Sequence, residues 1–407
     1  MNFIFYFGIL LLISYITLIF ISPFKSIFFA IVIKPILDMS FSIYIIENIN
    51  LSRIISILFA LQMFFIILLN LKIIRRFSGN WFVFIWFLIT ILSYFWLGYK
   101  DIYSSLELLF RYSNFILPFI AIPFIIKKNE SGFFLILIIA SLMPIILTIL
   151  QISGFHFGFY EKTIGGFLRP KGFFHDSFTN RLYFIYGLCG ASYFILVNCK
   201  IYKKIFAIIL FVLAGLCMYK LYSKSGYLII LLYLFLLLFK TTYKLKLLII
   251  FSLLVFFVFN STKIYTHIST TYQKEISYIM GKEKFEKIFK GRIQGWKENI
   301  NEWKKFNLLK KIFGSSEIAS GMHNDFLRIL YCNGIIGLLF YITFLVYLII
   351  KLIPNAFLTK NILYSLSSVL LGSFFLDSIG LVPTLYPAYN WMVWGIISYT
   401  INKKLFN

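Results

Sequence analysis

Charged residues are scarce in this chain, and acidic ones are the scarcest. Asp and Glu together make up 15 of the 407 residues, and all charged residues together make up 13%. Soluble domains contain about 25% charged residues, whereas this chain is 60% hydrophobic and has a mean hydropathy of +0.89. The composition therefore excludes a soluble fold and indicates a membrane protein.

Cysteine is also rare, and its four copies lie in or at the ends of hydrophobic segments. They are Cys189, Cys199, Cys217 and Cys332. Because none lies in a long polar loop, neither a disulfide framework nor a thiolate metal site is indicated. Paired carboxylates and clusters of metal ligands are likewise missing from the predicted outer loops. We expect chemistry that needs neither a metal nor a cofactor.

Long apolar runs recur along the chain, and each is long enough to cross a bilayer as a helix. We predict an all-α, polytopic membrane protein with about twelve transmembrane helices. The first run lacks a basic n-region and a small-residue cleavage site, so we interpret it as a retained span and not as a signal peptide. The predicted spans are 3–21, 51–73, 80–98, 103–126, 132–152, 182–198, 204–220, 226–240, 246–260, 325–350, 361–380 and 390–403.

Residues 26–47 interrupt this pattern. Lys34, Pro35 and Asp38 fall within an otherwise apolar run, as expected of a re-entrant helix, a broken helix or a thirteenth span. Polar groups at that depth need protein or water around them. The sequence alone leaves the three alternatives open.

Short basic loops set the orientation. With the spans placed as above they fall on one face, which the positive-inside rule makes cytoplasmic. The net charge of +24 thus has a source in membrane orientation, and no nucleic-acid partner is expected. The basic residues of this face are Lys72, Arg75, Arg76, Lys127, Lys128, Lys200, Lys203, Lys204, Lys240, Lys244, Lys246, Lys351, Lys360, Lys403 and Lys404.

The opposite face carries two long polar loops, 153–181 and 261–324, which contain all four histidines. The larger loop has twelve Lys or Arg residues and six Glu. It separates an N-terminal transmembrane bundle, residues 1–260, from the C-terminal transmembrane helices, residues 325–407. We expect a polar loop of this length to carry an active site. Since no ATP pool exists outside the cytoplasm, an enzyme there must use a donor that is already activated.

Arg292 is the one arginine of the larger loop, and it opens an amphipathic stretch that runs from Gly291 to Phe313. Its guanidinium is a planar, permanently charged fork that suits a pair of phosphate oxygens. Apolar residues then recur at helical spacing between Lys and Glu. We expect a helix at the membrane interface, with Trp296 at the headgroup level, or a helix that packs against the bundle.

His323 and Asn324 close the larger loop where the next span begins. An imidazole can act as a general base or, when protonated, stabilise a leaving diphosphate, although a lone histidine at a helix start is often structural. Asn324 and Asp325 are natural N-caps for the following helix, whose N-terminus also favours an anion. Gly334 and Gly337 within that helix favour close packing.

The smaller loop holds a second basic cluster beside a proline and a glycine. Such a turn binds an anion or is an ordinary solvated loop. Lys224 lies between two serines on the same face, as a further phosphate ligand or as an interfacial anchor. The residues of the cluster are Arg169, Pro170, Lys171, Gly172, His175, Asp176, Asn180 and Arg181.

These features together resemble the Wzy-like O-antigen polymerase and O-antigen ligase superfamily of bacterial membrane proteins. The resemblance covers the number of spans and the large loop before the last three of them. It also covers a motif in which an upstream arginine precedes His-Asn, nine further residues and Gly. The residues that carry this motif are Arg292, Trp296, Gly314, His323, Asn324 and Gly334.

Two earlier segments add to the resemblance. Arg169-Pro-Lys-Gly172, with Asn180 downstream, is similar to the family's Arg-x-x-Gly…Asn element. Ser223-Lys224-Ser225-Gly226 resembles a Ser-Arg-Gly turn, with Lys224 in place of the usual arginine. Lysine cannot make a bidentate fork, so this departure puts the role of position 224 in doubt.

The resemblance implies a GT-C-like glycosyltransferase in the bacterial cytoplasmic (inner) membrane, with its active face on the periplasmic side. The donor would be a glycan on undecaprenyl diphosphate, and an acceptor hydroxyl would attack the anomeric carbon as the lipid diphosphate leaves. Arg292 would help to neutralise the leaving group, and His323 would accept the proton. The further diphosphate- and substrate-binding residues would be Arg169, Lys171, Lys224 and Asn324.

Three functions fit these expectations to different degrees. A polymerase, which joins repeat units on the lipid carrier, is our first expectation, with a chain-length regulator protein as a further partner. An O-antigen ligase, which moves the glycan to a lipid A–core or protein acceptor, has the same motifs and topology. A flippase or transporter of lipid-linked glycans would carry charged residues inside its spans, whereas here the ionisable residues concentrate at one face.

Overall fold

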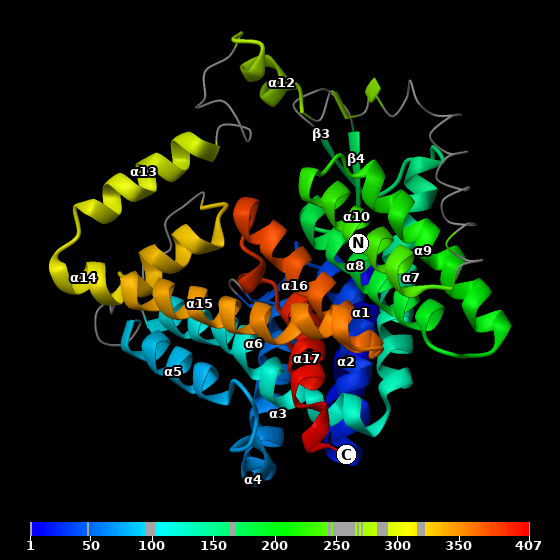
Figure 1. The fold of residues 1–407 in the computed structure, drawn as a ribbon, viewed down its shortest axis with the longest axis horizontal. Helices are drawn as coiled ribbons and strands as arrows, with labels where there is room; N and C mark the ends of the chain where they lie inside the picture. Colours follow the sequence, from blue (N-terminus) through cyan, green and yellow to red (C-terminus); the bar gives the residue numbers. More distant parts are fainter. Residues whose placement is uncertain are drawn as a thin grey trace. The chain divides into compact units, whose positions relative to one another are not determined.

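The computed structural model is predominantly helical, with two short β-hairpins (Figure 1). It describes residues 2–46, 49–93, 102–162, 168–242, 246, 265–266, 268–269, 272–282, 292–315 and 322–406. Over these residues the expectation of an α-helical protein is confirmed. The chain divides into two compact units. Unit 1 comprises Met1–Gln62, Lys128–Gln273 and Asn361–Val369, and unit 2 comprises Met63–Lys127, Lys274–Lys360 and Leu370–Asn407.

Unit 1 is a helical bundle in which α7 packs against α2, α8 and α9. Its helices are α1 (Asn2–Ile21), α2 (Pro23–Met39), α7 (Glu130–Ile152), α8 (Ser177–Leu196), α9 (Ile201–Lys220) and α10 (Lys224–Lys240). Its strands form two antiparallel pairs, β1 (Tyr44–Ile46) with β2 (Ile49–Asn50), and β3 (Phe159–Lys162) with β4 (Leu168–Gly172). Among the described helices, α3 (Leu51–Leu69) and α16 (Ile362–Gly380) contribute several residues to each unit, and the last residue of α6 and the first residue of α12 also belong to unit 1.

Unit 2 centres on α15, which packs against α5, α13 and α14. Its helices are α4 (Leu71–Ile74), α5 (Asn80–Ile91), α6 (Ile102–Lys128), α12 (Gln273–Ile279), α13 (Arg292–Lys304), α14 (Leu308–Phe313), α15 (Asp325–Leu358) and α17 (Pro387–Asn402). Two 3-10 turns complete it, η3 (Pro383–Leu385) and η4 (Lys403–Leu405).

Among the described helices, five are long and apolar enough to cross a membrane, namely α3, α7, α9, α15 and α16. Shorter apolar helices lie at Phe5–Ile21 and Asn80–Ile91. All seven coincide with predicted spans, although α15 extends beyond its predicted end. Residues 94–98 of the predicted span 80–98 and residues 247–260 of the predicted span 246–260 lie outside the described residues.

Residues 26–47 do not form a broken helix, because α2 continues through Pro35 without interruption. Near its end, Lys34 and Asp38 are buried and form an ion pair. The donors to the Asp38 carboxylate are Lys34 in α2, Ser52 in α3 and Tyr183 in α8. The polar groups of this segment are therefore surrounded by protein partners, as a charge in an apolar environment requires.

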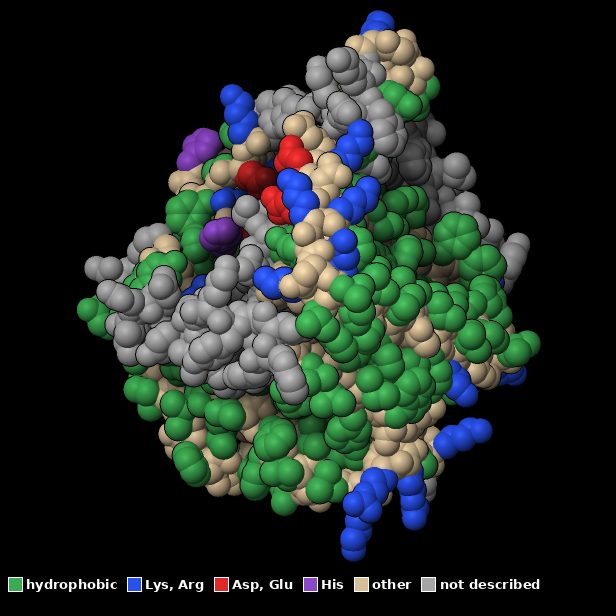
Figure 2. All heavy atoms as spheres, turned by 90° about the vertical axis from the view of Figure 1, so that its left-hand side faces the viewer, with side chains coloured by type: hydrophobic (Ala, Val, Ile, Leu, Met, Phe, Trp, Pro, Cys, Tyr) green, Lys and Arg blue, Asp and Glu red, His purple; other side chains and the backbone are tan. Residues whose placement is uncertain are grey.

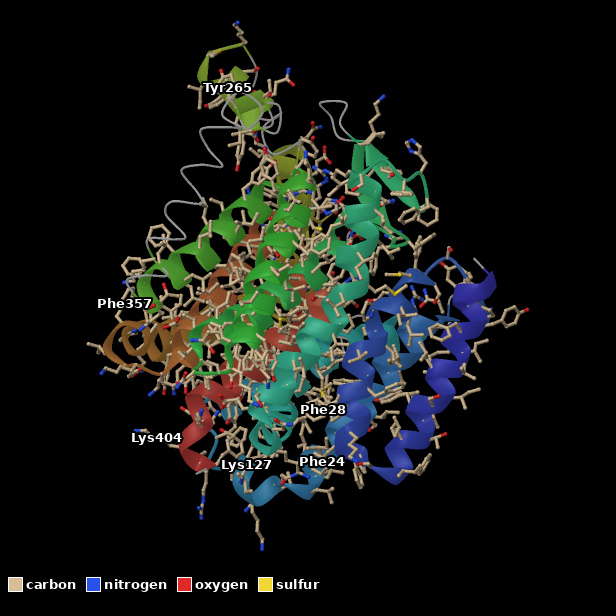
Figure 3. The ribbon with its side chains drawn as sticks, turned by 90° about the vertical axis from the view of Figure 1, so that its right-hand side faces the viewer. Phe24, Phe28, Lys127, Tyr265, Phe357 and Lys404 are labelled. Carbon is tan, nitrogen blue, oxygen red and sulfur yellow. The ribbon has the colours of Figure 1, made fainter. Side chains whose placement is uncertain are left out.

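The ends of each unit agree with the predicted assignment of loops to opposite faces. In unit 1, Phe24 at the start of α2 and Tyr265 of the larger loop lie at opposite ends (Figure 3). Lys128, which is predicted to face the cytoplasm, has its ammonium over the ring of Phe24. In unit 2, Lys127 and Lys404 lie at the same end (Figure 3), as expected for two residues of one basic face.

The amphipathic stretch between 291 and 313 is two helices and not the single helix that its periodicity predicts. α13 ends at Lys304, and the side chain of Asn307 then accepts a hydrogen bond from Lys310 N at 2.9 Å. Asn307 is therefore the N-cap of a new helix, α14, and supplies an acceptor for one of its unpaired N–H groups.

Gly314 and Gly334 allow α14 to lie directly against α15. Their φ angles are +95° and +69°, a region that favours glycine. α15 leaves helical geometry at Gly334, where a Cβ would overlap the backbone of Ile312. A Cβ on Gly314 would overlap the backbone of Cys332. The packing role predicted for Gly334 therefore comes with a kink that only glycine forms without strain.

This packing predicts the effect of single Gly→Ala substitutions. Gly334→Ala should destabilise unit 2 by about 2 kcal/mol or more, because it adds backbone strain of about 1–3 kcal/mol to overpacking of similar size. Gly295→Ala in α13 is the matched control, since a Cβ there meets nothing within 4 Å. Thermal unfolding of the purified protein should show a lower midpoint for Gly334→Ala and an unchanged or higher one for Gly295→Ala. Equal midpoints for the two variants would contradict this account of the kink.

Candidate functional site

The smaller loop folds as the β3–β4 hairpin, and Gln151 at the end of α7 holds it in place. The Gln151 side chain donates to two carbonyls on the β3 side and accepts from Gly172 N at 2.9 Å on the β4 side. In the hairpin, Glu161 pairs with Arg169 across the two strands. The strand that carries Arg169 is thereby anchored to the end of α7.

Arg169 is buried, with 8% of its surface exposed. Its Nη2 donates to the carbonyl of Tyr222 at 2.8 Å, and its Nη1 lies 3.4 Å from the Glu161 carboxylate. Within the described part of the chain, its Nε is buried and has no hydrogen-bond partner. Burial lowers the pKa of Arg169, Glu161 opposes this shift, and the positive charge of Arg181 adds to it. A buried guanidinium with an unused donor and a second cation nearby suits an anion.

Arg181, in the second turn of α8, binds the same turn of chain as Arg169. Its Nη1 donates to Ser223 Oγ at 2.5 Å and to Ser225 Oγ at 2.6 Å. Ser223 is the N-cap of α10, where its Oγ accepts from Gly226 N. The arginine cluster, defined as Arg169, Arg181, Glu161, Tyr222, Ser223 and Ser225, therefore lies at the N-terminus of a 17-residue helix, which favours negative charge.

The two lysines predicted beside this site make other contacts. Lys171 Nζ donates to the carbonyl of His175 at 2.8 Å. Lys224 Nζ lies 5.2 Å from the centroid of the Tyr272 ring, within the range of a cation–π contact. The structure thus brings Arg169 together with Arg181 and gives Lys171 and Lys224 contacts with loop residues. The roles of Lys171 and Lys224 as phosphate ligands stay predictions.

Asp176 caps α8 and pairs with His175. Its Oδ1 accepts from Thr179 N at 2.6 Å, and its Oδ2 lies 3.3 Å from His175 Nδ1. The hydrogen bond to Asp176 raises the pKa of His175 above its ordinary value. Burial acts to raise the pKa of Asp176, but hydrogen bonds from His175 and Thr179 outweigh it and leave that pKa below its usual range. The capping carboxylate is therefore held in its ionised form.

In unit 2, Arg292 and Asn324 both bind the last carbonyls of α16. Arg292 Nη1 donates to Gly380 O, and Asn324 Nδ2 donates to Ile379 O at 3.0 Å. Asn324 Oδ1 accepts from Leu327 N at 3.0 Å, which makes it the N-cap of α15. Carbonyls at a helix C-terminus lack partners within the helix, so these two side chains complete the end of α16. The predicted N-cap is confirmed, and a substrate role for Asn324 stays a prediction.

His323 immediately precedes this cap, and its side chain is exposed. Its backbone position is set by Asn324, which is tied to both α15 and α16. The three predicted site residues of unit 2, Arg292, His323 and Asn324, are therefore brought together at one place. An exposed imidazole at this position can exchange protons with a hydroxyl group from solution.

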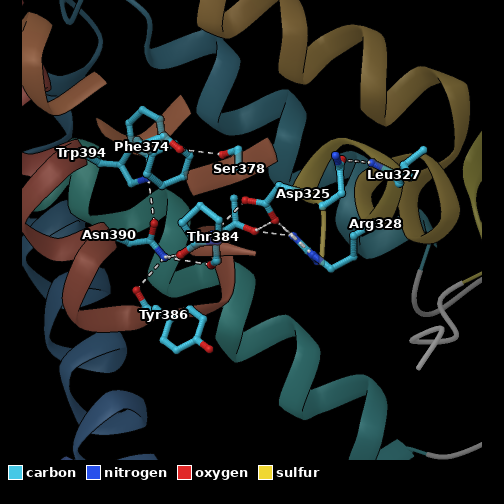
Figure 4. Close-up of polar contacts among 11 residues, drawn as sticks. Asp325, Leu327, Arg328, Phe374, Ser378, Thr384, Tyr386, Asn390 and Trp394 are labelled. Carbon is cyan, nitrogen blue, oxygen red and sulfur yellow. Dashed lines mark hydrogen bonds and ion pairs between the residues drawn. The ribbon is translucent and has the colours of Figure 1, made fainter. Parts of the chain in front are cut away.

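A buried polar network that the sequence did not predict lies beside this place (Figure 4). Asp325 and Arg328 form an ion pair at 3.0 Å, and both are almost fully buried. Thr384 contributes its backbone N–H and its hydroxyl to the Asp325 carboxylate at 3.1 and 2.5 Å. Asn390 then donates to the Thr384 carbonyl at 2.8 Å, which extends the network to α17 (Figure 4). The spacing of Asp325 and Arg328 on one helix face was the available sequence signal.

No family model matches the chain, and no curated protein matches it.

The buried ion pair predicts strongly non-additive mutations. Arg328→Met should destabilise the protein by about 3–5 kcal/mol, because it leaves the Asp325 carboxylate buried without its cation. Asp325→Asn should also destabilise it, whereas the double variant should cost clearly less than the sum of the two single changes. Unfolding midpoints of the four proteins measure this coupling. Additive losses would mean that the two side chains stabilise the fold independently.

Proposed function

We propose that this protein polymerises lipid-linked glycan repeat units at the outer face of a bacterial cytoplasmic membrane. It would be a glycosyltransferase with about twelve spans and a GT-C-like arrangement, whose donor is an oligosaccharide on undecaprenyl diphosphate. The growing chain moves from one lipid carrier to the next repeat unit. A chain-length regulator protein is a further expected partner.

The observation that carries this proposal is the arginine cluster of unit 1. Both guanidinium groups are buried: that of Arg169 lies 3.4 Å from the Glu161 carboxylate, and that of Arg181 donates to the hydroxyl groups of Ser223 and Ser225. The Nε of Arg169 is an unused, buried donor among the described residues, and the N-terminus of α10 adds partial positive charge. Burying such a charge is costly unless an anion accompanies it. A diphosphate supplies that anion and accepts hydrogen bonds from both arginines.

A membrane location narrows the choice of anion. Helices α7 and α9, whose ends lie next to the loops that form the cluster, are long and apolar enough to span a bilayer. An anionic ligand that reaches such a place with an activated sugar is a lipid-linked diphosphate sugar. Neutralising the diphosphate in the transition state lowers the barrier to its departure, and one such charged donor contributes about 10²–10³ in rate.

For the residues of unit 2, the roles in the proposed reaction come from the sequence resemblance alone. An acceptor hydroxyl forms the new bond to the anomeric carbon, its proton passes to His323, and the bond to the diphosphate oxygen breaks. The lipid diphosphate leaves with that electron pair. Arg292 and Asn324 fix the end of α16 next to His323. Arg292 is thus a positioning residue here, in addition to its predicted charge effect on the leaving group.

A ligase and a transporter remain the alternatives. A ligase shares the reaction and differs in its acceptor. One observation favours a transporter: the ion pairs Lys34–Asp38 and Asp325–Arg328 are buried charges within helices. Each of these pairs has no net charge and lies close to one end of its helix. A pair in such a position can be explained by its contribution to local structure. A translocation path instead needs charges arranged along the span.

The proposal predicts a glycan defect in specific variants. A strain that lacks this gene would be complemented with the wild type, Arg169→Lys, Arg181→Lys, His323→Ala or Lys162→Gln. The first three substitutions should collapse the surface glycan ladder to a single repeat, because lysine cannot reproduce the arginine forks and alanine cannot accept the proton. Lys162→Gln is the matched control: it removes an exposed positive charge from the same hairpin and should leave the ladder intact. Membrane levels and unfolding midpoints of each variant separate loss of activity from loss of folding.

Other outcomes of this experiment choose between the alternatives. Long polymer on the lipid carrier beside a bare final acceptor would assign the protein as a ligase. A wild-type ladder in all variants that fold normally would overturn the site assignment and favour transport.

A further inference from the structure

α14 carries two leucines on the outside of unit 2. Leu308 is 72% exposed and Leu309 is 57% exposed. Four lysines surround them in the sequence, Lys304, Lys305, Lys310 and Lys311, and no acidic residue lies between 303 and 313. These six residues are called the α14 face. Exposed leucines among lysines are unusual on a surface that meets only water.

The aromatic residues of the same segment do not contribute to this face. Trp303 and Phe306 pack against a buried cluster of Met322, Tyr331 and Cys332, and the Phe306 and Tyr331 rings lie 4.9 Å apart in an edge-to-face arrangement. The Nε1 atoms of Trp296 and Trp303 are buried. The buried Nε1 atoms agree with the alternative expectation, in which this segment packs against the bundle, and the leucines of α14 are exposed.

α14 packs against α15, a helix that is long and apolar enough to span a membrane. Ser315 N donates to Tyr331 O at 3.0 Å, and Ser93 Oγ donates to Phe313 O at 2.6 Å. These bonds fix the C-terminal end of α14 next to the kink of α15. On α15 the outward apolar residues begin immediately after that kink and continue along the helix: Ile335, Ile336, Leu339, Ile342, Val346, Ile349, Ile350 and Ile353. The α14 face thus borders the surface that a spanning α15 turns toward lipid.

Figure 2 shows the same boundary from the side of α13 and α14. Basic and acidic side chains lie side by side along α13, and a broad hydrophobic surface begins where they end (Figure 2). A change from charged to apolar side chains over the length of one short helix corresponds to the transition from lipid headgroups to acyl chains.

We propose that the α14 face is a membrane anchor that docks onto anionic phospholipid headgroups on the side of the larger loop. Leu308 and Leu309 insert at the boundary between headgroups and acyl chains, and the four lysines bind the phosphates. Charge complementarity favours this occupant, because a face with four lysines and no acid attracts an anionic bilayer surface. The anchor holds α13, and with it Arg292, at the membrane surface. It does not depend on the proposed reaction, since only the lipid contact is invoked.

The test uses the full chain in lipid nanodiscs and a fluorescent label. Cys199 is replaced by serine, because it is only half-buried, whereas Cys189, Cys217 and Cys332 are buried. An environment-sensitive dye is then attached at Leu309→Cys, at Leu308→Cys, or at the control Gln294→Cys on the exposed polar side of α13. Quenching is measured with a nitroxide-labelled lipid and with iodide, in phosphatidylcholine alone and in its mixture with phosphatidylglycerol.

We expect the lipid nitroxide to quench the labels at 308 and 309 several-fold more than the label at 294. Phosphatidylglycerol should strengthen this quenching, and exchange of all four lysines for glutamine should abolish the effect of phosphatidylglycerol. Quenching of 309 by iodide to the same extent as 294, with no quenching by the lipid nitroxide, would overturn the proposal. Protection of 308 and 309 from both quenchers would overturn it as well and would assign the face to a protein partner or a second copy.

Discussion

Arg169 and Arg181 both bind the turn at residues 222–225, so two positive charges lie close together in unit 1. Two guanidinium groups held against residues 222–225 repel one another, and burial strengthens the repulsion. Glu161 offsets one of them. The carbonyl of Tyr222 and the hydroxyl groups of the turn satisfy hydrogen bonds but carry no full charge. An anionic ligand that accepts hydrogen bonds from both guanidinium groups would reduce this repulsion, and the proposed function is based on that expectation.

Unit 2 depends on a different constraint, which is the need to complete the end of α16. Arg292 at the start of α13 and Asn324 at the N-cap of α15 both bind carbonyls in the last turn of α16. The Asp325–Arg328 pair then ties the start of α15 to Thr384 (Figure 4). His323 immediately precedes these fixed points, so its backbone position is set by them. Mutations of Arg292 are thus expected to act on structure and on chemistry together.

Much of the helical layout could be predicted from the sequence, since apolar runs and capping residues are local signals. The start of α15 at Asn324 is an example. The break between α13 and α14 was missed, although Asn307 is itself a capping residue, because the apolar periodicity continues across it. Arg169 could be predicted from its basic, turn-rich surroundings. Arg181 was not given a ligand role, because its significance lies in contacts to Ser223 and Ser225, which are far away in the sequence.

The most direct measurement of the central claim is binding of undecaprenyl diphosphate to the purified full chain in nanodiscs, followed by the rise in unfolding midpoint with ligand concentration. We predict that the lipid diphosphate stabilises the wild type and Lys162→Gln, and that Arg169→Lys and Arg181→Lys lose most of this stabilisation. Undecaprenol, which lacks the diphosphate, should stabilise all four proteins only weakly. Equal stabilisation of the arginine variants and the wild type by the diphosphate would contradict the account, because the arginine cluster would then not be where the diphosphate binds.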